Sequence, residues 1–209
     1  EWGPEMSKNL FFIQPKDHND FHAPWYKQTI DLYGCKVCKD LRPEYLGRVF
    51  DAYFQWPLGR EALTTMLLSI NVARVDFLGL FGDAVEEYLQ LGKVYLGDGT
   101  PQSDFVTFTA KRRLVIRGGR RSSYAGMCPT CGRQKYIAFY PFYTVRAGYW
   151  KQSLYVPWPE RGLVVSQELF CRIDRRKWKG ISIFELPVVD EPQDGIDALP
   201  RDFAIGGST

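Results

Sequence analysis

Two Cys-x-x-Cys pairs constrain this chain more than any other feature of its sequence. The first pair is Cys35 and Cys38, and the second is Cys128 and Cys131. A gap of two residues lets both thiolates of a pair face one point, and two such pairs supply the four sulfur ligands of a tetrahedral zinc site. One ion bound by all four would join segments about 90 residues apart and close a long loop. The spacing therefore favours a structural zinc site shared by both pairs.

The second pair has the sequence of a zinc knuckle. Pro129 bends the chain between the thiols, and Gly132 lets backbone amides approach the sulfur without a clash from a Cβ atom. In the first pair, Lys39 stands where that glycine would be. The alternatives are two disulfides, one redox-active pair, or unrelated surface thiols. A closed four-sulfur site leaves no open position for water, so it indicates a scaffold rather than a catalyst.

Length and composition indicate one globular unit or two small ones. The chain has 209 residues, of which 45% are hydrophobic, so it can bury a substantial core. Its net charge of +3 is too mild to indicate nucleic acid or membrane as a partner. No apolar run is long enough to span a membrane, and residues 1–9 lack the features of a signal peptide. Thiols suited to metal then favour the cytoplasm.

We expect one zinc-clipped α+β domain over residues 10–190, in which residues 41–127 form an insertion between the two cysteine pairs. Residues 1–9 are interpreted as a flexible N-terminus or a remnant of cloning. Residues 191–209 are interpreted as a C-terminal tail, because prolines, glycines and scattered acids interrupt them.

The expected fold class is α+β, mainly antiparallel β with a few short helices, organised around a zinc knuckle pair with four cysteine ligands. Helices are predicted over 61–70, 83–91 with Gly92 just past its end, and from the N-cap Ser166 to Lys177. Cys171 falls in the last of these and is expected to be a small buried core residue. Strands are predicted over 10–13, 93–96, 104–109, 113–117, 136–139, 142–146, 152–156, 163–165 and 181–184.

Catalytic motifs are missing from the sequence, which favours a protein that is not an enzyme. His18 and His22 have metal-ligand spacing, but Asn19 replaces the glutamate that a zinc protease uses as its base, and Pro24 disfavours a helix there. Neither histidine begins the His-x-Glu motif of zinc deaminases. The chain also has no phosphate-binding Gly-rich loop and no nucleophile elbow.

A zinc-ribbon nucleic-acid-binding or regulatory protein is the alternative from another class. Basic residues at 111–113 and at 117, 120 and 121 lead into the second cysteine pair, and Arg133 and Lys135 follow it. Beside Tyr124 and Tyr136, such a hairpin could follow a phosphate backbone and stack bases. Arginines on the solvent face of a strand pair explain the same pattern, and a dedicated binder is usually more basic. Nucleic acid is therefore not the expected partner.

The first cysteine pair, the long insertion, the Cys-Pro-Thr-Cys-Gly knuckle and the segment 178–188 together resemble bacterial double-CxxCG immunity proteins. These proteins are best known from myxobacterial polymorphic toxin systems. The resemblance covers about residues 10–190, is most specific over 128–188, and departs from the pattern at Lys39. It implies a cytoplasmic immunity protein that binds and neutralises a cognate toxin in the producing or kin cell, by occluding the toxin's active site.

Candidate contact residues for such a partner come from the aromatic segment after the knuckle, because Trp and Tyr often anchor interfaces. Most of these rings fit a core better than an interface. The chain is slightly basic, so either an acidic patch such as Asp83, Glu86 and Glu87 is local, or the toxin is not a basic nuclease. The candidate contact residues are Tyr140, Tyr143, Tyr149, Trp150, Tyr155 and Trp158.

Overall fold

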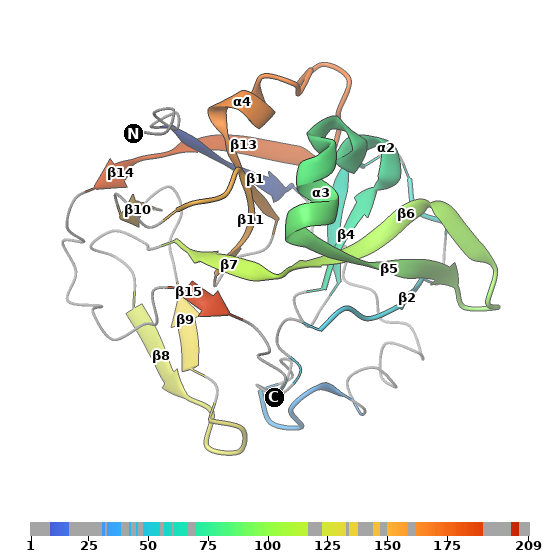
Figure 1. Ribbon diagram of the computed structural model, residues 1–209. Coiled ribbons are helices and arrows are strands. Elements are labelled where there is room, and N and C mark those ends of the chain that lie inside the picture. The colour runs from blue at the N-terminus through green and yellow to red at the C-terminus, as the bar shows by residue number, and fades with distance from the viewer. Residues whose placement is uncertain are drawn as a thin grey trace.

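Two large β-sheets, two small two-stranded sheets and a few short helices make up the part of the chain that the computed structural model describes (Figure 1). The sequence segments that it describes are 9–16, 31, 33–38, 42, 45, 48–54, 57–59, 61–66, 70–116, 123–132, 134–137, 144–146, 150–158, 162–189 and 202–204. No helix among them is long and apolar enough to cross a membrane.

The first sheet has six strands in the order β13-β1-β12-β11-β7-β15. Its middle strands are the apolar runs of the sequence, because both faces of the sheet are covered and alternating polar residues would be buried. Their bounds are β1 Leu10–Pro15, β7 Arg112–Val115, β11 Leu154–Trp158, β12 Leu163–Ser166, β13 Ile181–Leu186 and β15 Asp202–Ala204. Strand β15 lies within the segment that we interpreted as a tail, and it pairs with β7.

The second sheet has five strands in the order β2-β5-β6-β4-β3. All of it belongs to the long segment between the two cysteine pairs, so that segment supplies a complete layer of the fold. The strands are β2 Ala52–Phe54, β3 Leu63–Met66, β4 Ile70–Arg74, β5 Leu89–Leu96 and β6 Pro101–Ala110. Two small two-stranded sheets complete the description, β8 Ser123–Met127 with β9 Gln134–Ile137 and β10 Val145–Arg146 with β14 Val188–Val189.

A central hydrophobic core lies between the two large sheets and under the helices. It combines Phe11 and Ile13 of β1 with Phe108 of β6, Phe77 and Trp178. The alternate residues of β1, Leu10 and Phe12, face a second core on the other side of the six-stranded sheet. A third core covers the outer face of the five-stranded sheet and includes Phe54, Val72 and Phe105.

A buried polar contact ties the two sheets together. Asn71 of β4 is 3% exposed, and its Oδ1 accepts the N–H of Gly162 at 3.0 Å, just before β12. Gly162 has φ +116°, and a Cβ atom there would collide with the backbone carbonyl of Ile13 in β1. Only glycine lets the chain turn so close to β1.

Two of the three predicted helices form and are shorter than predicted, and the third is not formed. The described helices are α2 Val75–Leu78, the 3-10 turn η3 Gly79–Phe81, α3 Asp83–Tyr88 and α4 Gln167–Phe170, and α2 and η3 are not among the predicted helices. The helix predicted over 61–70 is wrong, because Leu63–Met66 is strand β3 and pairs with β4. Its Thr64 and Thr65 are β-branched and favour that extended form.

Two further helix boundaries need correction. The helix predicted over 83–91 ends at Tyr88, since Leu89 is buried and begins β5, and Gly92 lies inside that strand. Ser166 caps α4 as predicted, with its Oγ accepting the Leu169 N–H. That helix ends at Phe170, and the Asp174 carboxylate accepts the Arg176 N–H at 2.9 Å in the turn that follows.

The prediction of mostly strands with a few short helices is confirmed, but the strand pairing is more mixed than expected. Parallel pairs join β2 to β5, β7 to β11 and β10 to β14. The other described pairs are antiparallel. Parallel neighbours need long connections, and no local sequence pattern reports which distant strands meet.

Candidate metal centre

The four cysteines of the two Cys-x-x-Cys pairs meet in one cluster, as their spacing predicts. Their sulfur atoms all lie within 4.8 Å of one another. Cys35 Sγ is 3.7 Å from Cys128 Sγ, and Cys38 Sγ is 3.8 Å from Cys131 Sγ. The two short distances therefore run between the pairs, so neither pair is a separate site.

The second pair forms the tip of the β8–β9 hairpin, which lies at the lower left of the molecule in Figure 1. Cys128 follows β8 directly, and the chain turns through Pro129 to Cys131. The Gly132 N–H donates to the Cys128 carbonyl at 2.9 Å, and Gly132 has φ +69°. A residue with a side chain rarely adopts that conformation, so the glycine of the knuckle closes the turn.

The first pair repeats this turn without the glycine. In both pairs the first cysteine is buried, the next two residues are exposed, and the second cysteine is half-buried. Cys38 and Val37 donate backbone hydrogen bonds that lower the pKa of Cys35. Thus the residue at position 39 does not prevent the amides of the first turn from facing its sulfur.

Backbone amides also stabilise the thiolate form at the second pair. The N–H groups of Cys131 and Thr130 lower the pKa of Cys128 to about 6. Hydrogen bonds to a thiolate favour the charged form over the neutral thiol. Because thiolates are the form that binds metal, both turns prepare the cluster for a cation.

The sulfur geometry fits a tetrahedral metal ion. With a zinc–sulfur bond of about 2.3 Å, the edge of a sulfur tetrahedron is about 3.8 Å long. The two short sulfur–sulfur distances, 3.7 and 3.8 Å, match that edge. A disulfide needs sulfur atoms about 2.05 Å apart, so the cluster holds four free cysteines and no disulfide.

The first pair is fixed to the five-stranded sheet by an aromatic cluster. The Tyr33 ring lies 4.6 Å from Phe50 and 5.2 Å from Tyr45, and the Tyr33 carbonyl accepts the Arg42 N–H. These rings pack on the outer core of that sheet. A metal bound by the cluster would therefore join the five-stranded sheet to the β8–β9 hairpin. No sequence pattern indicates that Tyr33 performs this role.

Cys171 does not belong to this cluster, and its predicted burial is wrong. It is exposed and forms the C-cap of α4, where Gln167 Nε2 donates to its sulfur at 3.3 Å. Because α4 ends at Phe170, the apolar face expected for a longer helix does not extend to residue 171. The histidines at 18 and 22 lie outside the described residues.

Of the candidate contact residues, Trp150 and Tyr155 have described side chains, and neither is exposed. The prediction that Tyr155 contacts a partner is wrong, because Tyr155 is 2% exposed and packs in the core of the six-stranded sheet. Its hydroxyl accepts the N–H groups of Lys151 and Gln152. Trp150 is half-buried against the same core. Trp158 ends β11, but its side chain is not among those described. Positions 140, 143 and 149 lie outside the described residues.

Charged groups noted in the sequence are placed as follows. Asp83, Glu86 and Glu87 are exposed on α3, but Lys111 Nζ donates to the carbonyls of residues 86 and 87 and places a cation beside them. Arg113 is 5% exposed and lies within β7. Lys111 and Arg113, two of the cations considered for a nucleic-acid surface, are therefore engaged within the protein, one by hydrogen bonds to α3 and the other by burial.

Comparison with models of known protein families finds no match, and comparison with curated proteins finds none either. The assignment of a metal centre therefore depends on the geometry and chemistry of the four cysteines alone.

Proposed function

We propose that this chain is a zinc-stabilised immunity protein that binds and neutralises a cognate toxin domain. The observation that carries the proposal is the closed four-cysteine cluster formed by two matching turns. Four sulfur ligands complete a tetrahedron and leave no position for water or substrate, so such an ion holds structure rather than performing catalysis. The resemblance of the cysteine pattern and of the segment 178–188 to double-CxxCG immunity proteins supplies the biological role.

Zinc is the metal that we propose, because a tetrahedral site of four thiolates suits zinc or iron and zinc is the usual structural ion of paired knuckles. The ion would hold Cys35 and Cys128 together across a sequence separation of 93 residues. That link would make the five-stranded sheet and the β8–β9 hairpin depend on each other. A rigid surface then binds a partner with a smaller loss of conformational entropy.

The proposed action on the toxin is steric. The chain would cover the active site of the toxin domain in the cytoplasm of the producing or kin cell, with no chemistry of its own. The burial of Arg113 and the contacts of Lys111 weigh against the alternative of a nucleic-acid-binding ribbon. Retention on nucleic acid at moderate salt would favour that alternative.

A growth-rescue assay tests this function. Toxin domains encoded in the genome of origin are expressed in a host whose growth they stop, with or without this chain. We expect one of them to be neutralised and to co-purify with the chain, and Cys128→Ser to abolish the rescue while Cys171→Ser preserves it. Rescue that survives the loss of the cluster would separate the function from the metal, and no rescue by the folded chain would contradict the proposal.

A further inference from the structure

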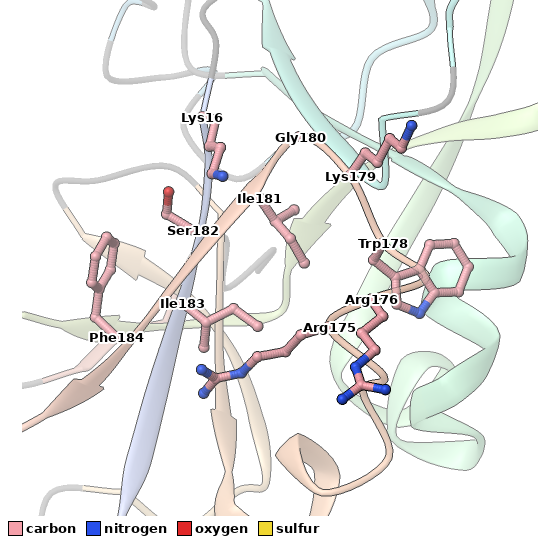
Figure 2. A pocket seen from close by; sticks show the side chains of 10 residues that line it. All are labelled: Lys16, Arg175, Arg176, Trp178, Lys179, Gly180, Ile181, Ser182, Ile183 and Phe184. Carbon is pink, nitrogen blue, oxygen red and sulfur yellow. The ribbon is translucent and has the colours of Figure 1, made fainter.

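A cavity of about 530 Å³ lies along β13 at the edge of the six-stranded sheet (Figure 2). Four of its lining residues are basic: Lys16, Arg175, Arg176 and Lys179. All four side chains belong to exposed residues, and the described residues that line the cavity include no Asp or Glu. In the part of the chain that the structure describes, none of the four forms an ion pair with a carboxylate. The cavity is therefore a site of concentrated positive charge.

The backbone of β13 offers a second kind of contact. Among the described strands, β13 pairs with β1 alone. The Lys16 N–H donates to the Gly180 carbonyl at 2.8 Å, so the backbone N–H and C=O groups of the even-numbered residues of β13 point toward β1. In an antiparallel ladder the intervening residues point the other way. The N–H and C=O groups of Ile181, Ile183 and Glu185 thus face the outer edge.

This edge is bonded at both ends but has no described partner between them. The carbonyl of Lys179 accepts the Ala62 N–H at 3.0 Å, and the carbonyl of Pro187 accepts the Val145 N–H at 3.0 Å. Both acceptors are odd-numbered, like the outward groups of β13. The intervening residues span a length of about 20 Å, at about 3.3 Å per residue. An open edge of this kind is a template for another extended segment.

The aromatic rings near the cavity are already in contact with other groups. Trp178 is 7% exposed, lies 5.0 Å from Phe77 and carries Lys177 over its ring. Phe170 stacks on Phe11, and Arg175 lies over it at 4.9 Å. Single-stranded nucleic acid is bound by stacking its bases on available rings. The described surface instead offers cations and backbone hydrogen-bonding groups, which suit a peptide.

We propose that this edge binds an extended acidic segment of a partner protein, which adds a strand beside β13 and places carboxylates against the basic cavity. Backbone hydrogen bonds supply affinity in this mode of recognition, and side chains on alternate residues supply selectivity. A second copy of this chain is disfavoured as occupant, because pairing of two β13 edges would bring two sets of cations together. The inference does not depend on the partner's being a toxin.

A labelled synthetic peptide of eight residues, alternating glutamate and valine, is the probe. Fluorescence anisotropy measures its binding to the full chain at low and high salt. Arg175→Glu with Arg176→Glu is expected to weaken binding by about ten-fold or more at low salt and by less at high salt. The matched control is Lys93→Glu with Lys151→Glu, which changes charge equally at exposed lysines that do not line the cavity. It should change the affinity by less than about three-fold, through long-range charge alone.

A second pair of variants tests the backbone contact. Glu185→Pro removes an outward N–H at an exposed position, whereas Glu185→Ala removes only the side chain. We expect the proline variant to bind the peptide at least about five-fold more weakly than the alanine variant. Near-ultraviolet circular dichroism of each variant checks that the core around Trp178 is unchanged.

Three kinds of result would overturn the proposal. The first is no saturable binding of the acidic peptide, or equal binding of a peptide with N-methylated backbone groups. The second is binding of a single-stranded oligonucleotide in place of the peptide, with loss in the Arg175/Arg176 variant. The third is a concentration-dependent dimer that Glu185→Pro abolishes, which would assign the edge to a second copy of the chain.

Discussion

Removal of a metal bound by the four-cysteine cluster should destabilise the whole fold, and the structure sets the scale of the loss. The short sulfur contacts each join residues 93 apart in sequence. In the chain-entropy treatment of disulfides, cross-linking a loop of that length raises the free energy of the unfolded chain by about 4.7 kcal/mol at 25 °C. A native domain is stable by about 5–15 kcal/mol, so a loss of this size is a large part of the total.

Urea denaturation followed by tryptophan fluorescence measures the effect. Cys128→Ser removes one ligand, and Cys171→Ser removes an exposed cysteine outside the cluster as the matched control. We expect the first variant to unfold at a much lower urea concentration, and the second to differ from the unmodified chain by no more than about 0.5 kcal/mol. A chelator should destabilise the unmodified chain and the Cys171→Ser variant but have little further effect on Cys128→Ser.

Equal unfolding midpoints for the two cysteine variants would refute this reasoning. The reasoning would also be refuted if a strong chelator removed the metal and the urea unfolding midpoint of the chain did not change. In either case the two sheets would hold the segments together without a metal link, and the cluster would be incidental to stability.

Three further predictions concern contacts outside the cluster. Gly162→Ala should cost about 3 kcal/mol or more, because its Cβ would collide with the Ile13 carbonyl at a positive φ. Asn71→Ala should lower the free energy of unfolding by about 2–3 kcal/mol, since it leaves the Gly162 N–H buried without its acceptor. Urea unfolding measures the effect of both substitutions, and losses under about 1 kcal/mol would contradict these two predictions. The pKa of Asp98 is lowered by the Thr100 N–H, so its contribution is present at neutral pH and is lost as pH falls through that lowered value. The stability difference between the unmodified chain and Asp98→Asn should therefore shrink as the pH falls into the acid range, and a difference independent of pH would contradict this.

The apolar runs of the sequence predict the centre of the six-stranded sheet well. Leu10, Leu163 and Ile181 each begin a strand close to where the run begins. Both faces of β1 and β12 are buried, so hydrophobicity alone marks those two strands. The segment at 61–70 misleads because its apolar residues have helical spacing, whereas pairing with β4 holds Leu63–Met66 extended. Local periodicity cannot report a partner strand.

The four-cysteine cluster is the part of the site that the sequence predicts best. Two residues between cysteines impose a tight turn, and that constraint is local enough to read from the chain. The burial of Tyr155 and the exposure of Cys171 depend on packing between distant segments, so composition could not assign them. The basic edge of β13 escapes prediction for the same reason. Arg175 and Arg176 fit equally well as the charged end of a helix, until the chain is seen to turn at Asp174.

Whether one metal ion holds all four cysteines can be measured directly. The measurement is the metal content per chain by elemental analysis, on protein purified without added metal, with native mass spectrometry to establish the stoichiometry. We expect one zinc per chain, lost in both Cys35→Ser and Cys128→Ser and kept in Cys171→Ser. A folded chain that carries no metal, or that carries it equally after loss of Cys35 or Cys128, would contradict the shared site.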